Sequence, residues 1–346
     1  MERHRDRQRR LVTMRVPRAL AALLATSGAG CASPHPTSAP DAATTVDAPA
    51  IVPDAAPAWW HPGPGDSRDW DIQLAGAIDV SAARTMYDLD LWSLVPAATQ
   101  LDYGDGDPVT VPAGALAGTI ATLHARTPRT IVVCHLETGA LELARPDARK
   151  FPGYKAGMKT CPATPAAGSI IGKAAVEAGE CWLDISATGR AKLDALIAKR
   201  LDLAAQIGCD GVDTDRNDLA AYTTGFPVTV DDQRAWYRAI ASLGHARTLS
   251  VGMRDANEIP GFTDMLAADF DWALIQRCGE FGDCDTARPF INAFKAVLAI
   301  DYQAPDGQGG GVDPTLACMR QGMGQVQDGL VKDLPPTKAV RVQCTP

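Results

Sequence analysis

Short apolar runs recur along most of the chain, and helix-sized stretches separate them. Eight such runs span residues 71–75, 86–91, 130–136, 182–185, 211–214, 249–253, 272–276 and 296–301. Strands that alternate with helices in this way are typical of a parallel sheet covered by helices. Eight alternations favour a closed barrel over an open sheet, so we predict an α/β fold of the TIM-like (β/α)8 type.

The first 31 residues have the three parts of an export signal. Residues 1–18 carry seven Arg, residues 19–25 are apolar, and small residues lead to Cys31. We therefore expect residues 1–30 to be a signal peptide of the lipoprotein type, with Cys31 lipidated. The alternative is an ordinary signal peptide cut at the small residues. The apolar run is too short for a membrane span, so a lipid would be the only membrane anchor.

The remaining composition defines the domain organisation and the compartment. Residues 31–58, rich in Ala, Pro and Thr, cannot bury enough apolar surface to fold and are predicted to be a disordered linker. Residues 59–303 form the predicted barrel, and residues 304–346 look like an irregular tail. Eight cysteines besides Cys31 allow up to four disulfides, in any of 105 pairings, which suits an exported protein. Cys278 and Cys284 could close a small loop, and Cys318 and Cys344 could hold the tail.

The densest group of acids lies in residues 208–218, GCDGVDTDRND. A helical pattern over residues 191–207 comes first, and a short apolar step then leads to Asp213, Asp215 and Asp218. The carboxyl ends of barrel strands carry the chemistry in folds of this type. Neighbouring carboxylates there can have their pKa values driven apart into acid and base roles. We therefore expect Asp213 and Asp215 to be catalytic, whereas a solvated loop acid that caps the next helix is the alternative for Asp215.

Several longer motifs occur in a characteristic order. They are WWHPGPGDSRDWDIQLAGAID (59–79), YDLDLW (87–92), IVVCHLETGALELARPDARKFP (131–152), ECWLDIS (180–186), GCDGVDTDRND (208–218), GFPVTVDDQRAWYRAIASLGHARTLSVGMRD (225–255), FDWALIQRCGEFGDC (270–284) and PFINAFKAVLAIDY (289–302). Their order resembles glycoside hydrolase family 114, the endo-α-1,4-polygalactosaminidases. The resemblance implies a TIM-like barrel that cleaves α-1,4-linked galactosamine or a related amino-sugar polymer, without a cofactor.

Glycoside hydrolysis by this class of enzyme requires two carboxyl groups, one protonated and one ionised. By the resemblance, one family carboxylate aligns with Asp215, and Asp213 stands in place of a Glu. The second, a Glu at the end of strand seven, aligns with Gln276, whose amide cannot act as general acid or base. Asp255 or Glu280 is then expected to supply the missing carboxyl group, and we assign Asp255 as the third catalytic residue.

A wider set of side chains is predicted to bind substrate at the ends of the strands. This set comprises Asp90, Glu137, Gln276, Arg216, Asp301 and Tyr302. Asp90 follows an apolar strand and, as an alternative, caps a helix.

The sequence disfavours nucleic-acid and metal binding and leaves two alternatives to a hydrolase. The net charge of −8 disfavours nucleic acid as a partner. A calcium loop starting at Asp213 would need Gly and Glu where the chain has Asp218 and Thr224, so no metal is expected. If no second carboxyl group reaches the site, the protein is instead a catalytically impaired surface lipoprotein that binds the polysaccharide. A barrel with protein partners is the third reading.

Overall fold

The computed structural model describes residues 59–255, 259, 261–303 and 311–345. The predicted signal peptide, Cys31 and the linker 31–58 lie outside the described residues, as do residues 304–310. None of the helices in the described part is both long and apolar enough to cross a membrane.

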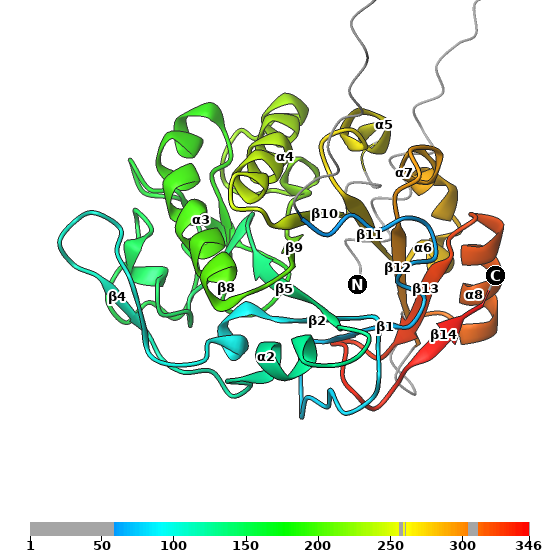
Figure 1. Ribbon diagram of the computed structural model, residues 1–346. Coiled ribbons are helices and arrows are strands. Elements are labelled where there is room, and N and C mark those ends of the chain that lie inside the picture. The colour runs from blue at the N-terminus through cyan, green and yellow to red at the C-terminus, as the bar shows by residue number, and fades with distance from the viewer. Residues whose placement is uncertain (1–58, 256–258, 260, 304–310, 346) are drawn as a thin grey trace, which may run out of the picture. The chain divides into compact units, whose positions relative to one another are not determined.

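A nine-stranded sheet forms the centre of the described domain, in the order β1-β2-β5-β9-β10-β11-β12-β13-β14. Each strand pairs in parallel with the next as far as β13, and β14 is antiparallel to β13. The bounds are β1 Trp70–Gln73, β2 Met86–Asp90, β5 Ile131–Glu137, β9 Gly211–Asp215, β10 Ser250–Arg254, β11 Trp272–Gln276, β12 Val297–Tyr302, β13 Asp328–Lys332 and β14 Val342–Cys344. In Figure 1 the strands follow a curve with the helices outside it. The predicted TIM-like α/β fold is confirmed.

Two strands differ from the sequence prediction. The run 182–185 was expected to be the fourth barrel strand, but it belongs to β8 (Glu180–Leu183), which pairs antiparallel with β6 (Ala140–Glu142) and β7 (Ile171–Ala174) in a separate sheet. β5 pairs directly with β9 instead. The eighth parallel strand is β13, which lies in the segment that was expected to be an irregular tail.

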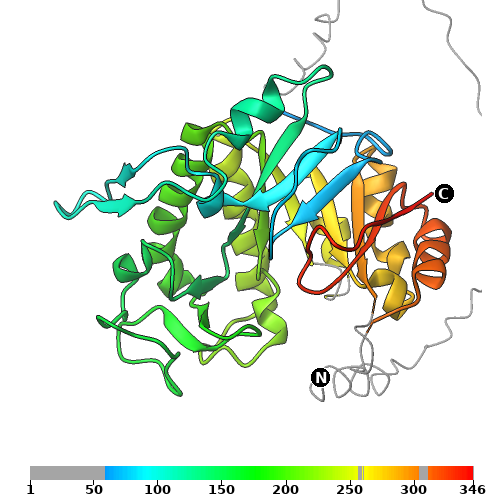
Figure 2. The ribbon, with the colours of Figure 1, turned by 90° about the horizontal axis from the view of Figure 1, so that it is seen from below.

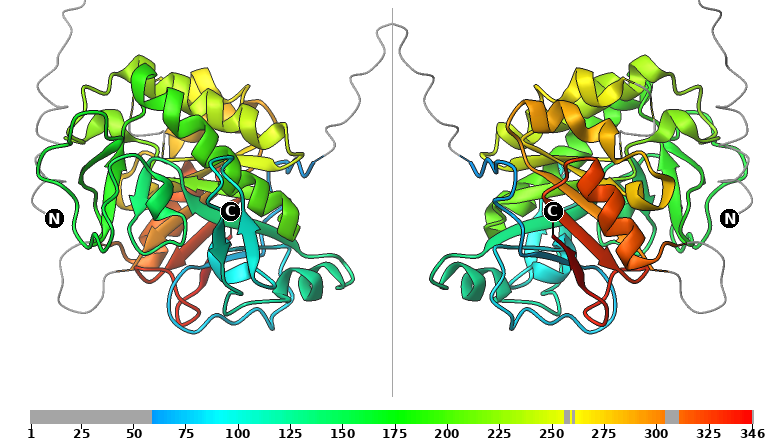
Figure 3. Two further views of the ribbon diagram at one scale, coloured as in Figure 1. Left: turned by 90° about the vertical axis from the view of Figure 1, so that its left-hand side faces the viewer. Right: turned by 90° about the vertical axis from the view of Figure 1, so that its right-hand side faces the viewer.

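Helices and short turns cover the outside of the curved sheet (Figures 2 and 3). The helices are α2 Thr119–His124, α3 Ala187–Ile207, α4 Val230–His245, α5 Phe262–Leu266, α6 Cys278–Phe281, α7 Arg288–Asn292 and α8 Pro314–Met323. Single 3-10 turns are η1 Leu91–Leu94, η2 Ala148–Lys150, η3 Leu219–Ala221 and η5 Cys284–Ala287. A hairpin of β3 (Thr99–Leu101) and β4 (Val109–Val111) projects from the body (Figure 2).

The ends of the two long helices are fixed by local sequence. The Ser186 hydroxyl accepts a hydrogen bond from the Gly189 amide at the start of α3, and Gly208 ends that helix with φ 94°. α4 begins with a capping box, in which Thr229 and Asp232 each accept from the other's backbone amide. The predicted helix over 191–207 is therefore the greater part of α3.

Alternation along the strands divides the core into two layers. Outward residues pack beneath the helices, whereas inward residues such as Trp70, Leu274 and Ile300 form a separate cluster inside the curve. Gly252 belongs to the inner face, where a Cβ atom would lie 2.2 Å from the Trp272 ring, so a larger residue would displace that ring. The inside of the sheet is thus filled by large apolar side chains near one end and left for polar side chains at the other.

Side-chain contacts join β1 and β13, the first and last strands of the parallel part of the sheet. Trp70 Nε1 donates to the Asp328 carbonyl oxygen at 2.9 Å, and Lys332 Nζ donates to Asp71 Oδ1 at 2.7 Å. Four disulfides stabilise the domain: Cys134–Cys209, Cys161–Cys181, Cys278–Cys284 and Cys318–Cys344. The prediction of four disulfides is confirmed, including the small loop and the connection of the C-terminal segment.

Candidate active site

Polar side chains gather where the inner face reaches the carboxyl ends of six adjacent strands. They are Asp88, His135, Glu137, Asp213, Asp215, Arg254, Gln276 and Tyr302. The register places His135 beside Asp213 and Glu137 beside Asp215 on β5 and β9. Since side chains two residues apart share one face of a strand, each of these two strands delivers a pair of polar groups to the same space.

Arg254 lies at the centre of this group and is 3% exposed. Its Nη1 donates to Asp213 Oδ2, and its Nε lies 3.3 Å from Asp215 Oδ1 and 3.6 Å from Asp255 Oδ2. The predicted catalytic residues Asp213, Asp215 and Asp255 are therefore brought together around one buried guanidinium. Arg254 itself is a residue that the sequence analysis did not single out.

Asp215 is held in its ionised form. Burial alone would raise the pKa of Asp215, but the Arg254 guanidinium, followed by Arg216 and His135, lowers the pKa well below its ordinary value. The Arg216 backbone N–H also donates to Asp215 Oδ1 at 2.6 Å, and a hydrogen bond to the charged form acts in the same direction. Asp215 is consequently available as a carboxylate at any pH near neutrality.

Asp255 has the opposite tendency. Burial raises the pKa of Asp255 to about 7, and the nearby carboxylates of Asp215 and Asp218 add to the rise, against the lowering effect of Arg254 and Gln276. The residue follows β10 with φ 57°, a left-handed conformation that is uncommon outside glycine and is often found at functional sites. Asp215 and Asp255 are therefore neighbouring carboxyl groups whose pKa values are driven apart, which is the arrangement of an acid–base pair.

Gln276 and Tyr302 form a hydrogen-bonded chain to Asp255. Gln276 Nε2 donates to Asp255 Oδ2 at 2.5 Å, and the Tyr302 hydroxyl donates to Gln276 Oε1. Because Tyr302 occupies the amide oxygen, the Gln276 side chain is fixed with its N–H groups toward Asp255. The proton of a neutral Asp255 is then carried by Oδ1, the oxygen that Gln276 does not contact. The chain thus orients Asp255 within the site.

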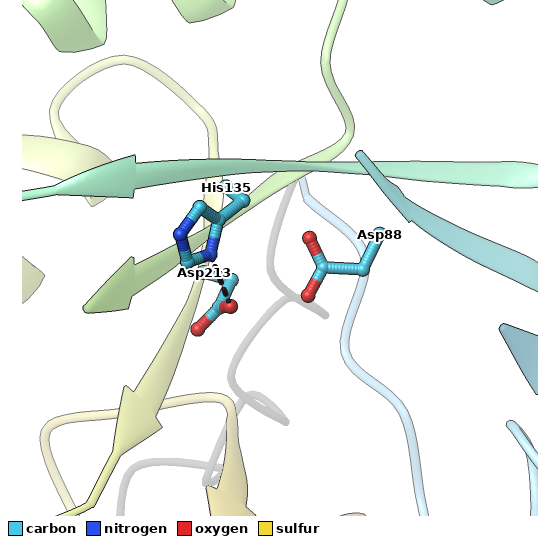
Figure 4. A group of neighbouring side chains, drawn as sticks. All are labelled: Asp88, His135 and Asp213. Atoms are coloured by element: carbon cyan, nitrogen blue, oxygen red, sulfur yellow. Dashed lines mark hydrogen bonds and ion pairs between the residues drawn. The ribbon is translucent and has the colours of Figure 1, made fainter. Parts of the chain in front are cut away.

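A second cluster lies beneath these residues (Figure 4). His135 Nδ1 and Asp213 Oδ2 are 2.8 Å apart, and the Asp88 carboxyl group lies beside them. Asp88 is completely buried, and no donor in the described part of the chain bonds to either of its oxygens. Burial, and after it the Asp213 charge, raises the pKa of Asp88 well above its ordinary value, so this group is a neutral carboxylic acid.

Asp88 could have been found in the sequence. It lies two residues before Asp90 in YDLDLW, and residues two apart share one face of a strand. The donor atoms of Asp88, His135 and Asp213 lie within 4.8 Å of one another, a spacing that suits a metal ion. However, Asp213 Oδ2 is already shared by His135 and the Arg254 guanidinium, whose positive charge opposes a cation at this position. We therefore assign no metal to this cluster.

The buried acid predicts a pH-dependent stability. The pKa of Asp88 rises on folding, so its contribution to stability is complete below pH about 4 and is lost as the pH rises toward the folded-state value. Asp88→Asn removes this loss, and its Tm relative to wild type should increase steadily from pH 4 to pH 8. The exposed-acid variant Asp231→Asn should show no such trend. A constant Tm difference for Asp88→Asn would contradict a neutral Asp88.

Glu137 and Arg216 lie beside Asp215, as the prediction of a common site requires. Burial raises the pKa of Glu137, and its Oε2 has no hydrogen-bond donor among the described residues. Arg216 has φ 58° and extends its guanidinium toward the small antiparallel sheet, where Nε lies 3.1 Å from Glu180 Oε2. Arg216, directly after Asp215, therefore connects this carboxylate to the charged residues Glu137 and Glu180.

Three other predicted acids lie elsewhere. Asp301 is fully buried on the outward face of β12, where it accepts from the Gly279 and Glu280 amides and from Gln321, so it is a structural residue rather than a substrate-binding one. Glu280, the alternative to Asp255, is bonded to Arg277 instead. Asp90 caps η1 through the Ser93 amide and pairs with Arg145, apart from the group around Arg254.

Comparison with known proteins identifies one family and several solved structures of similar fold. The model of glycoside-hydrolase family GH114 matches residues 50–345. The crystal structure of Aspergillus fumigatus Ega3 in complex with galactosamine is similar with a TM-score of 0.62 and 24% identity, over 82% of this chain and 97% of that one. The glycoside hydrolase domain of Pseudomonas aeruginosa PelA has a TM-score of 0.49 and 13% identity, over 80% and 99%. Curated protein sequences give no match.

Proposed function

Because the chain belongs to glycoside hydrolase family GH114, we propose that it hydrolyses an amino-sugar polysaccharide with Asp215 and Asp255 as the two carboxyl groups. Asp215 acts as the ionised group, nucleophile or base, and Asp255 protonates the leaving oxygen. The observation that carries this proposal is the pair itself: two carboxyl groups beside one guanidinium, with pKa values displaced in opposite directions.

The spacing of the pair suits glycoside hydrolysis by two carboxyl groups. The two oxygens that face Arg254 Nε lie 3.3 and 3.6 Å from it, so they are separated by no more than these two distances together. Retaining glycosidases have carboxyl groups about 5–5.5 Å apart, and inverting ones about 6.5–9.5 Å apart. This limit admits both ranges, so NMR of the freshly released sugar decides between retention and inversion of configuration.

The proposed substrate is an α-1,4-linked galactosamine polymer or a related one. The sequence motifs support it, as does the galactosamine bound to the similarly folded Ega3. The chain carries a net charge of −8 although residues 1–30 are strongly basic, so the mature protein is more acidic still. An acidic surface attracts a partly deacetylated, cationic polymer.

We also propose that the protein works outside the cytoplasm, attached to a membrane only through lipid on Cys31. The four disulfides support export, because such bonds persist mainly in oxidising compartments. Mass spectrometry of the N-terminal peptide would distinguish a lipidated Cys31 from a free N-terminus produced by an ordinary signal peptidase.

The direct test is incubation of the purified protein with galactosamine oligomers, followed by chromatography of the products. Shorter oligomers from the wild-type protein would support the hydrolase. The alternative, a binding protein without activity, has one specific observation in its favour: Gln276, an amide, stands where the sequence resemblance places a Glu. Binding without cleavage, together with cleavage gained by Gln276→Glu, would establish that alternative and contradict our proposal.

A pH profile tests the role of Asp255. A general acid must be protonated, so wild-type kcat should fall as the pH rises through about 7, where Asp255 loses its proton. Asp255→Asn should lower kcat/KM by about 10² to 10⁴-fold and remove this alkaline limb. An Asp255→Asn variant with a wild-type profile would show that another group is the acid.

Gln276 should tune this profile without supplying a proton. Its hydrogen bond stabilises the ionised form of Asp255, so Gln276→Met should raise the pKa of Asp255 and move the alkaline limb to higher pH. The Tyr302→Phe variant, which only releases the amide oxygen, should give a smaller shift in the same direction. A shift to lower pH in Gln276→Met would contradict this role.

A further inference from the structure

We propose that a cleft beside the end of β2, apart from the catalytic pair, is a second subsite that binds one sugar unit of the polymer through its ammonium group. This inference rests on the proposed function, since it assumes the same polymer. The cleft, called here the side cleft, has a volume of about 550 Å³ and is lined in part by Asp90, Trp92, Ser93, Ala113, Glu142 and Arg145. Binding sites for small molecules have volumes of about 300–1,000 Å³.

The charged wall of the side cleft is held in place by hydrogen bonds. Arg145 Nη2 lies 2.7 Å from Asp90 Oδ1 and 2.6 Å from Glu142 Oε1. Asp90 is fixed further, because its Oδ2 accepts from both the amide and the hydroxyl of Ser93. The three charged side chains keep 14 to 23% of their surface exposed, so a ligand can reach them without unfolding the loop.

The remaining wall is suited to the face of a pyranose ring. Pro112, Ala113, Ala144 and Pro146 also line the side cleft and add a small, rigid apolar surface to the charged groups. Trp92 lines the same space and is 7% exposed, and the Arg145 guanidinium lies over its ring, 5.8 Å from the centroid. Sugars combine such apolar faces with polar edges.

The charge of the side cleft selects a cation. Its ionisable lining consists of two carboxylates and one guanidinium, Asp90, Glu142 and Arg145, which leaves one negative charge in excess. An ammonium group on the sugar can share Asp90 or Glu142 with Arg145, whereas an N-acetyl group has no charge to offer. The side cleft should therefore prefer galactosamine units to acetylated ones.

A chain of contacts joins the side cleft to the catalytic pair. Glu142 on β6 is the registered neighbour of Glu180 on β8. Glu180 bonds to Arg216, the residue directly after Asp215. A polymer that crosses this charged rim would place one unit beside Asp215 and a later unit in the side cleft. Such an arrangement predicts that affinity increases with oligomer length until the side cleft is filled.

The test compares the affinity for oligomers before and after a large side chain is introduced into the side cleft. In an Asp215→Asn background, which prevents cleavage, calorimetry compares galactosamine disaccharide with long oligomers. We expect long oligomers to bind at least about tenfold more tightly than the disaccharide. Ala113→Trp, an exposed position in the lining, should remove this difference. The matched variant Ala117→Trp, exposed on the same loop but outside the lining, should keep it.

A charge variant tests the proposed selectivity. Glu142→Gln should weaken the binding of long galactosamine oligomers more than the binding of their N-acetylated counterparts. Added salt should reduce this difference in affinity. Equal effects of Ala113→Trp and Ala117→Trp, or an affinity independent of length, would overturn the subsite. These outcomes are separate from the failure of the proposed function, which is the absence of products from wild-type protein in the cleavage assay.

Discussion

Asp215→Asn should reduce kcat/KM for galactosamine oligomers by about 10³-fold or more, the largest loss of activity expected from one substitution. The amide has nearly the shape of the carboxylate but carries no charge, so it can neither attack the anomeric carbon nor activate water. It also leaves Arg254 with one anionic neighbour fewer, so Asp255 loses both its partner and part of its electrostatic environment.

The measurement is steady-state hydrolysis with thermal unfolding as a check of the fold. Asp264→Asn, an exposed acid away from the strand ends, is the matched control and should retain wild-type rates. Product formation by Asp215→Asn at more than a tenth of the wild-type rate would remove Asp215 from the mechanism. The assignment of Asp255 would then also lose its basis, because the two roles are defined by their difference.

Arg200→Met should reduce the free energy of unfolding by about 3–5 kcal/mol, the largest loss of stability expected. Arg200 and Asp147 are both completely buried and form two hydrogen bonds of 2.7 and 2.9 Å. Arg200 also lies over the Trp92 and Phe151 rings and donates to the Glu137 carbonyl oxygen. The substitution leaves the Asp147 charge buried without its partner, which is the costly step.

Urea unfolding with the disulfides intact provides the measurement. Arg190→Met is the matched control, because Arg190 is on the same helix α3 and pairs with Asp194 at the surface. Arg190→Met should reduce the free energy of unfolding by less than about 1 kcal/mol. The double variant Arg200→Met with Asp147→Leu should recover part of the stability, since no unpaired charge remains. Equal losses for Arg190→Met and Arg200→Met would show that burial does not decide the contribution of these pairs.

The architecture could be predicted from hydrophobic runs, but not the membership of every strand. Residues 182–185 and 328–332 show why. The first run is short and apolar, and periodicity cannot distinguish a barrel strand from a strand of a separate antiparallel sheet. The second, Asp328–Lys332, contains only two large apolar residues. Its buried acid accepts from the Ser67 amide and its buried lysine pairs with Asp71, both of which are distant in the chain. Its place in the sheet depends on those long-range contacts.

The acids of the candidate site could be predicted because they follow apolar strands. The arginine that pairs with them could not, because its partners come from other strands. Asp213, Asp215 and Asp255 each stand at the end of an apolar run, so they were identified from the sequence. Arg254 was missed because a single Arg at the end of a strand is usually a surface residue. Only the fold shows that it is surrounded by three carboxyl groups. Asp301 was misplaced for a similar reason, since its direction depends on strand parity and on the amides of α6.

The pairing of β13 with β12, and the contacts of β13 with β1, have a consequence for biogenesis. β1 is synthesised first, but its contact with β13 cannot form until the final segment of the chain has been synthesised. In a nascent or C-terminally shortened molecule, the exposed edges of β1 and β12 would be able to pair with other chains.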